Sequence, residues 1–256
     1  MPPRILILSS QVAASPVGGL AQTRVLADLD IDAILAPTVL FGRHPGLGPP
    51  GGGTVSEALF GGVLAGIEAD GVFATLTGLI TGYFATEAQV AIAARTIDTV
   101  RQAAPGVRII VDPVMGDTGR GLYVQAEVAE AISAHLVPRA DLLAPNAWEL
   151  QRLSGQAVSG PASALAAARS MGRPVLVSSV ELGPSIGVVY VDRDNAWLAS
   201  HQRLNTAPNG TGDRLTAVFV GAQARGSAPR DALAMAVASV AAWVGVRGEV
   251  ALEALT

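Results

Sequence analysis

Short apolar runs of strand length alternate with helix-like stretches along the whole chain, and this alternation constrains the fold more than any other feature. Several runs are continuous and rich in β-branched residues, which is typical of strands covered on both faces. The strand candidates are Arg4–Ser9, Ala33–Leu40, Gly71–Thr77, Val107–Val114, Leu142–Pro145, Pro174–Ser179, Gly187–Val191 and Ala196–Ser200. The helix candidates are Gly19–Asp28, Val55–Glu68, Glu87–Ala103, Glu127–Ala134, Ala147–Leu153, Ala162–Met171, Asp213–Arg225 and Arg230–Val246.

This order predicts a doubly wound, mostly parallel sheet, in which ligands bind beyond the carboxyl ends of the strands. The last two strand candidates follow each other directly, and "VDRDNAW" between them predicts a hairpin turn. The chain has 256 residues, of which 50% are hydrophobic, and no composition shift divides it. We therefore expect one large α/β domain over residues 1–256.

The charge and the missing residue types exclude several classes of protein. The net charge is −4 without a basic run, which argues against nucleic-acid or anionic-membrane partners. With no cysteine, the chain forms no disulfide, zinc ribbon or thiol nucleophile. All 17 basic residues are arginine, so a P-loop NTPase and an enzyme with an internal lysine imine are excluded. The apolar opening is too short for a signal peptide and no stretch is long enough to span a membrane, so we expect a cytoplasmic protein.

A glycine- and proline-rich segment, "GRHPGLGPPGGG", covers Gly42–Gly53. It is either a surface loop or a flap over a site, because long loops within compact domains often act as lids. Arg43 and His44 are accordingly either solvated loop residues or groups that reach a substrate when the flap closes. The three histidines, His44, His135 and His201, are far apart and have no metal-ligand spacing.

Two carboxylates follow the strand in "IIVDPVMGDTGRG", namely Asp112 and Asp117. Oxygen ligands at the carboxyl end of a parallel strand suit Mg²⁺. The alternative is that Asp112 caps the amides of the loop and Asp117 begins a turn.

A second polar cluster stands in "LLAPNAWELQRLSG", where Asn146 is placed to cap the next helix. Glu149 follows three residues later, as in a capping box. The alternative is that Asn146 and Glu149 both face a metal–phosphate cluster at the strand ends.

The third motif is "NGTGD", which heads a helix. Glycines let the backbone approach a phosphate, and the N–H groups of Gly210, Thr211 and Gly212 can stabilise a developing anion. Asp213 can then accept a proton from an attacking hydroxyl. The alternative is an ordinary N-cap aspartate after a glycine turn.

The order "DPVMGD", "LAPNAWEL" and "GTGD" resembles the ribokinase-like superfamily, and further segments resemble its pyridoxal kinase branch. These segments are "ILILSSQVAASPVGGLA", "PTVLFGRHPGLG" and "LTGLITGYFAT". The resemblance implies a three-layer α/β/α fold with a mostly parallel central sheet and helices on both faces. It also implies that there is no separate lid domain and that the protein is a homodimer.

For function, the resemblance implies transfer of the γ-phosphoryl group of ATP, with Mg²⁺, to the 5′-hydroxymethyl group of pyridoxal, pyridoxine or pyridoxamine. Asp213 would be the general base, and the backbone of Gly210, Thr211 and Gly212 the anion hole. The substrate site would comprise Ser10, Tyr83, Asp213, Pro45 and His44. The ATP site would comprise Asp112, Ala144, Asn146, Glu149 and Thr211, with adenine among the segments after Ser178. Asp112 and Glu149 would hold Mg²⁺, partly through water, with Asp117 in support.

The chain departs from the family pattern around the ring pocket. Gln11 replaces a histidine, and Ala13, Ala14 and Ser15 replace further pocket residues. Pro45 replaces a threonine and Leu47 a tyrosine, and the stretch from Ser179 to Gly210 is short. Two alternatives stay open: a hydroxymethylpyrimidine kinase, whose "GxDSSGGAG" opening fits poorly here, and a degenerate vitamer-binding protein without turnover.

Overall fold

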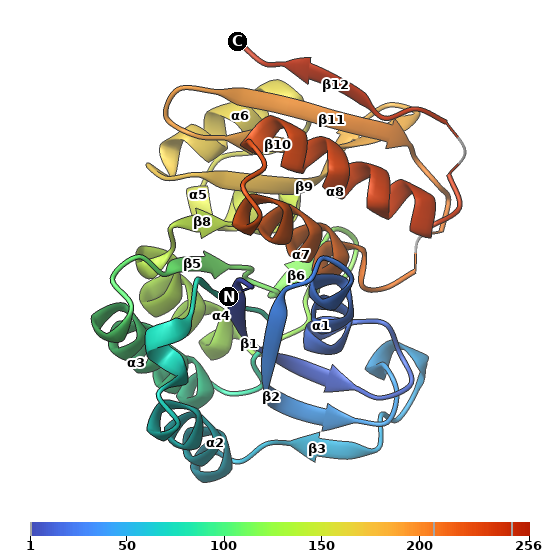
Figure 1. Cartoon of the computed structure of the whole chain (residues 1–256). Coiled ribbons are helices and arrows are strands. Elements are labelled where there is room, and N and C mark those ends of the chain that lie inside the picture. Colours follow the sequence, from blue (N-terminus) through green and yellow to red (C-terminus); the bar gives the residue numbers. More distant parts are fainter. Residues whose placement is uncertain (1, 207, 247) are drawn as a thin grey trace.

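A computed structural model describes residues 2–206, 208–246 and 248–256, and its centre is a ten-stranded sheet. The strand order is β12-β11-β10-β9-β8-β5-β4-β1-β2-β3 (Figure 1). The bounds are β1 Arg4–Val12, β2 Asp32–Phe41, β3 Gly52–Thr54, β4 Gly78–Thr81, β5 Arg108–Val111, β8 Leu142–Leu143, β9 Val175–Leu182, β10 Ser185–Val191, β11 Ala196–Gln202 and β12 Ala251–Ala254. A small separate hairpin pairs β6 (Gly116–Asp117) with β7 (Gly121–Leu122).

The six central strands, from β9 to β2, are parallel, which confirms the mostly parallel sheet. The strands β10, β11 and β12 at one end and β3 at the other are antiparallel. The expected hairpin is present between β10 and β11, where Val191 pairs with Ala196. In Figure 1, β12 and β3 form opposite edges of the sheet.

Helices cover both faces of the sheet, as expected from continuous apolar strands. The bounds are α1 Gly18–Asp28, α2 Glu57–Ala69, α3 Glu87–Ala103, α4 Ala126–Ala131, α5 Ala147–Ser154, α6 Pro161–Ser170, α7 Thr211–Ala224 and α8 Pro229–Trp243. Residues of α2 to α6 share one buried cluster, and residues of α1, α7 and α8 share the other. The described chain thus has three layers and no separate lid domain.

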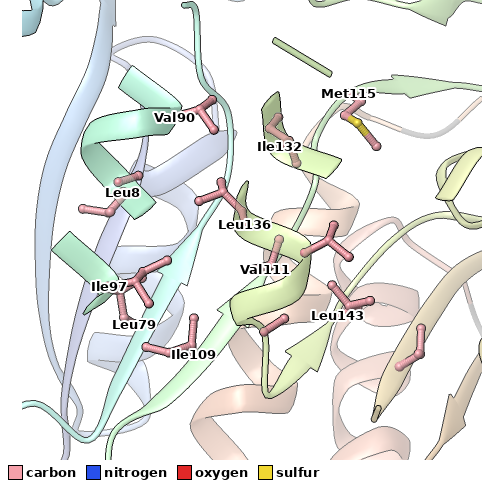
Figure 2. Packing of buried hydrophobic residues seen from close by; sticks show 14 of the residues in the cluster. Leu8, Leu79, Val90, Ile97, Ile109, Val111, Met115, Ile132, Leu136 and Leu143 are labelled. Carbon is pink, nitrogen blue, oxygen red and sulfur yellow. The ribbon is translucent and has the colours of Figure 1, made fainter. Parts of the chain in front are cut away.

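Alternate residues of each central strand enter opposite clusters because side chains alternate across a strand. Leu6 and Leu8 of β1 pack with the α2–α6 layer, whereas Ile5 and Ile7 pack with the α1–α7–α8 layer. Figure 2 shows the first layer, where Leu8 and residues of β4, β5 and β8 meet α3 and the segment after α4. Each such side chain stabilises the fold by about 1.5–3 kcal/mol relative to its exposed state.

The strand expected over Gly71–Thr77 was wrong. Residues Val72–Thr75 form a 3₁₀ turn, and the strand is the following β4, Gly78–Thr81. The backbone of Gly71 is left-handed, with φ of 72°, and Phe73 and Leu76 are buried at a spacing of three residues. The apolar run therefore contains a helical turn and then a strand, which period alone does not separate.

Other differences lie at the ends of elements. The helix α7 begins at Thr211 rather than at Asp213. The helix expected over Glu127–Ala134 is α4, and it continues as a π-helical turn over Ile132–Leu136. The short strands β3, β6, β7 and β12 were not expected. Among the described residues, no helix has both the length and the apolar character that crossing a bilayer requires.

Candidate active site

A cavity of about 910 Å³ opens beyond the carboxyl ends of β1, β5, β8 and β9, where a doubly wound sheet binds its ligands. Every residue expected at the site lines it. They are Ser10, His44, Pro45, Tyr83, Asp112, Asp117, Ala144, Asn146, Glu149, Gly210, Thr211, Gly212 and Asp213. The structure therefore brings together residues that come from almost the full length of the chain.

The helix α7 begins at the floor of this cavity. Its N-cap, Gly210, has a left-handed backbone with φ of 96°, and a Cβ there would collide with the carbonyl oxygen of Pro16. Only glycine fits this position without strain. No side chain caps the helix start. The N–H groups of the first turn are therefore available to an anion in the cavity.

Asp213 is the third residue of α7 and does not cap its own helix. Its Oδ2 accepts a hydrogen bond of 2.8 Å from the backbone N–H of Gly18, the first residue of α1. The reading of Asp213 as an ordinary N-cap is therefore wrong. Burial raises the pKa of Asp213 to about 6, although the Gly18 N–H acts in the opposite direction. A carboxylate with this pKa suits general base catalysis near neutral pH.

Asp112 directly follows β5 and is buried, with 8% of its surface exposed. Thr216 Oγ1, from α7, donates to its Oδ2 at 3.1 Å. Burial raises the pKa of Asp112 well above its usual value, and the nearby charges of Glu149 and Asp213 raise it further. The next residue but one, Val114, has φ of 44°, a left-handed backbone that is rare for a β-branched residue. Such strain is typical of functional loops.

Glu149 and Asn146 form a complete capping box at the start of α5. Asn146 Oδ1 accepts from the Glu149 N–H, and Glu149 Oε2 accepts from the Asn146 N–H, both at 2.9 Å. This confirms the capping reading of the pair.

Glu149 also fixes the loop after Asp112. Its Oε1 accepts from the N–H groups of Met115, at 2.7 Å, and Gly116, at 3.3 Å. Asn146 Nδ2 donates to the Gly116 carbonyl at 2.8 Å. Burial raises the pKa of Glu149 to about 7, although these backbone N–H groups oppose the shift. One side chain thus joins two of the sequence motifs.

Three carboxylates with raised pKa values at one cavity floor, those of Asp112, Glu149 and Asp213, favour a cation. Among the described residues, however, no three His, Cys, Asp or Glu side chains are grouped closely enough to hold a metal ion by themselves. This arrangement fits Mg²⁺, which keeps several waters and binds through one or two carboxylates together with substrate phosphates.

Ser10 and Tyr83 also line the cavity, near the ends of β1 and β4. Ser10 is 8% exposed, and its Oγ occupies the space that a Cβ on Gly18 would need. Two hydrogen bonds hold the backbone of Tyr83: its N–H donates to Ser9 Oγ, and Thr38 Oγ1 donates to its carbonyl. Burial raises the pKa of the Tyr83 phenol. The lining of the cavity also includes the apolar residues Val12, Val39 and Phe41.

Only part of the glycine-rich segment faces the cavity. His44 and Pro45 line the cavity, and His44 Nδ1 accepts from the Gly46 N–H at 3.0 Å. Burial and the neighbouring charge of Arg120 lower the pKa of His44. Arg43 instead donates to the Pro49 carbonyl within the segment, and Leu47 is 66% exposed. We call residues 42–53 the flap.

Sequence reasoning missed several residues of the cavity wall, including Gly18, Arg120, Tyr123 and Thr216. Burial raises the pKa of the Tyr123 phenol, and the charges of Glu149, Asp112, Asp213 and Asp117 raise it further, so it lies among the carboxylates. The glycine of "PVGG" was a possible signal for Gly18. Thr216 had no local signal, because its partner is 104 residues away.

Solved structures of pyridoxal kinases share this fold. Pyridoxal kinase from Entamoeba histolytica has a TM-score of 0.92 and 22% identity, with both chains covered in full. Pyridoxal kinase from Leishmania donovani, solved with ADP and ginkgotoxin, has a TM-score of 0.86 and 27% identity. That match covers 93% of this chain and 84% of the Leishmania chain. The fold and the cavity define a kinase of the ribokinase-like class.

Sequence comparison narrows this class to one family. The model of the phosphomethylpyrimidine kinase family matches residues 73–250. Pyridoxal kinase PdxY of Deinococcus radiodurans is 34% identical over 254 residues, covering 94% of this chain and 85% of that protein. A pyridoxine/pyridoxal/pyridoxamine kinase of Bordetella avium is 36% identical over 217 residues, covering 82% of this chain and 73% of that protein. The chain belongs to the phosphomethylpyrimidine kinase family and, within it, to the pyridoxal kinases.

Proposed function

We propose that this chain transfers the γ-phosphoryl group of ATP to the 5′-hydroxymethyl group of pyridoxal, pyridoxine or pyridoxamine. The position of Asp213 carries the proposal. It is a carboxylate with a pKa of about 6 that faces a large cavity from the first turn of an uncapped helix. The curated relatives named as kinases of these vitamers support the same reaction.

Asp213 accepts the proton of the 5′-hydroxyl as its oxygen attacks the γ-phosphorus. The N–H groups of Gly210, Thr211 and Gly212 stabilise the charge on the transferring group. The Gly18 N–H keeps the Asp213 carboxylate in one orientation. Positioning and charge stabilisation are nearly all that phosphoryl transfer requires of a protein.

Asp112 and Glu149 are the residues that would hold Mg²⁺, in part through water, with Asp117 in support. Mg²⁺ supplies positive charge to the phosphates of ATP. Asp112 is the better direct ligand, because Glu149 already accepts three backbone hydrogen bonds. Through its bonds to Met115 and Gly116, Glu149 holds the loop between Asp112 and Asp117.

ATP lies along the floor of the cavity, with Thr211, Ala144 and Asn146 beside its phosphates. Apolar residues extend the cavity toward β10, α7 and α8, and they suit the adenine ring: Ile186, Val188, Leu215, Val237, Val240 and Val244. The vitamer binds between Ser10 and Tyr83, under His44 and Pro45. Gln11, Ala13 and Ala14 are not among the described residues of the cavity wall.

We further propose that residues 1–256 act as one kinase domain, that the protein is a homodimer and that it works in the cytoplasm. The family resemblance supports the homodimer.

The test is coupled ADP release with Mg²⁺–ATP and, side by side, pyridoxal, pyridoxine, pyridoxamine and hydroxymethylpyrimidine. Turnover of a B6 vitamer supports the proposal. Turnover of hydroxymethylpyrimidine alone would instead make the chain a hydroxymethylpyrimidine kinase. Vitamer binding without turnover would make it a binding protein.

A further inference from the structure

An arginine that the sequence analysis did not single out reaches the cavity from the β6–β7 hairpin. Arg120 lines the same cavity as Thr211 and Asp213. Its Nη1 lies 4.0 Å from the position that a Cβ on Gly46 would take, so the guanidinium faces the flap. The influence of its charge on His44 agrees with this position.

The flap in turn adjoins the start of α7. The Asn209 Nδ2 lies 3.4 Å from the His44 Nδ1, and Asn209 immediately precedes the N-cap Gly210. Arg120, the flap and the open helix start therefore surround one part of the cavity, which is the part where the γ-phosphoryl group would be transferred.

The excess of negative charge in the cavity favours a positively charged group in this part of it. Asp112, Asp117, Glu149 and Asp213 all line it, and a bound triphosphate adds further negative charge. The chain has no lysine to balance them.

The basic side chains of the described cavity wall are His44, Arg120, His201 and Arg203. Arg203 is already paired with Glu181 at 2.9 Å. His44 already accepts the Gly46 N–H through Nδ1. Within the described residues Arg120 has no ion pair, so its charge remains available to a phosphate.

The hairpin that carries Arg120 is fixed at its base and open at its tip. At the base, Gly116 is bonded to Glu149 and Asn146, and a Cβ on Gly116 would collide with Trp148. At the tip, Gly119 and Gly121 flank Arg120 with left-handed backbones, at φ of 85° and 69°. No atom lies within 4 Å of a Cβ built on either glycine. Arg120 can therefore turn toward a bound nucleotide while the base stays in place.

We propose that Arg120 is a catalytic residue that donates hydrogen bonds to the γ-phosphoryl oxygens during transfer. This inference rests on the proposed function. The bond from the γ-phosphorus to the bridging oxygen breaks, and ADP leaves with its electron pair. A bond forms between the 5′-oxygen and the γ-phosphorus, and Asp213 takes the hydroxyl proton. The planar guanidinium matches two phosphate oxygens at once, which a lysine ammonium does not.

The experiment compares the wild type with Arg120→Ala, Arg120→Lys and the control Arg193→Ala. Arg193 is an exposed arginine on another hairpin, between β10 and β11, away from the cavity. For each protein, kcat and KM for ATP are measured with pyridoxal, ADP binding by calorimetry and Tm by scanning. Arg120→Ala is then assayed again with added guanidinium chloride at low concentration.

We expect Arg120→Ala to lower kcat by about 10²–10³-fold, the usual effect of removing one donor to a transition-state charge. ADP lacks the γ-phosphate, so its affinity and the Tm should stay close to wild type. Added guanidinium should restore part of the kcat of Arg120→Ala. The kcat of Arg120→Lys should lie between those of wild type and Arg120→Ala.

Wild-type kcat in Arg120→Ala would overturn the inference while leaving the proposed function intact. A loss of kcat with a lowered Tm and no rescue would also overturn it, because the arginine would then only support the hairpin. A wild type that turns over no vitamer would overturn the proposed function and this inference together.

Discussion

The carboxylate of Asp213 accepts a hydrogen bond of 2.8 Å from the backbone N–H of Gly18, 195 residues earlier in the chain. This contact joins the first turns of α1 and α7 at the cavity floor. Because a helix N-terminus favours negative charge, α1 helps to keep Asp213 ionised although the residue is partly buried. The contact also fixes the direction of the carboxylate before any substrate binds.

Replacing Asp213 by Asn should lower kcat by about 10²–10⁴-fold, the range expected for loss of a general base. Asn can still accept the Gly18 N–H, so the helix starts should stay in place. Calorimetry should give nearly wild-type ADP binding, and a variant with normal turnover would contradict the role of Asp213 as base.

The pH dependence of kcat/KM should follow the ionisation of Asp213. The base must be deprotonated, so kcat/KM should rise with pH through about 6 and then level off. The measurement is a profile from pH 5 to pH 8 in buffers of constant ionic strength. A rise centred near pH 4 would mean that burial does not perturb the carboxylate.

The raised pKa of Asp213 should also affect the free energy of unfolding, which it lowers at the pH where the base is active. The folded-state pKa of Asp213 lies above its usual value of 3.8, so the folded state binds the proton more tightly. This stabilising effect is complete below about pH 4 and is lost as pH rises through about 6. Asp213→Asn should therefore be more stable than wild type at pH 7.5, by up to about 3 kcal/mol at 1.36 kcal/mol per pKa unit. Urea unfolding at pH 7.5 and at pH 4 tests this, and an equal difference at both values would contradict it.

Replacing Glu149 by Gln separates its two roles. Gln has only one acceptor oxygen for the three N–H groups that Glu149 now binds, so we expect a loss of about 1–3 kcal/mol in unfolding free energy. If Glu149 also helps to hold Mg²⁺, the Mg²⁺ concentration for half-maximal activity should rise. An unchanged Mg²⁺ requirement with reduced stability would leave Glu149 as a structural cap.

Two glycines of the anion loop should respond differently to alanine. In Gly210→Ala, the left-handed backbone and the carbonyl of Pro16 oppose a Cβ, so both Tm and activity should fall. In Gly212→Ala, no atom lies within 4 Å of the new Cβ, and alanine favours the helix by about 1 kcal/mol. Tm should therefore hold or rise while KM for ATP increases, because the methyl group enters the phosphate site. Similar Tm losses in both variants would contradict this difference.

Most residues of the site could be predicted from local motifs, because each motif places its polar residues at the end of a strand or the start of a helix. The order of the three motifs, together with the family resemblance, assigned Asp112, Asn146 and Asp213 to one site, and all three line the cavity. The strand at Gly71–Thr77 was misplaced because an apolar run does not reveal where a turn ends and a strand begins. Gly18 had a possible signal in "PVGG", but Thr216 and Arg120 could not be predicted, because their contacts depend on distances between elements that the local pattern does not encode.

The sheet ends on both sides in short strands. The edge strand β3 has three residues, Gly52–Thr54, and the edge strand β12 has four, Ala251–Ala254, each antiparallel to its neighbour. Such edges offer few free N–H and carbonyl groups in a row to a strand from another molecule. The buried, β-branched strands whose carboxyl ends line the cavity would be prone to aggregate if their edges were free, and this strand order keeps them inside the sheet. We therefore expect the folded enzyme to resist fibril growth by edge-to-edge addition at high concentration.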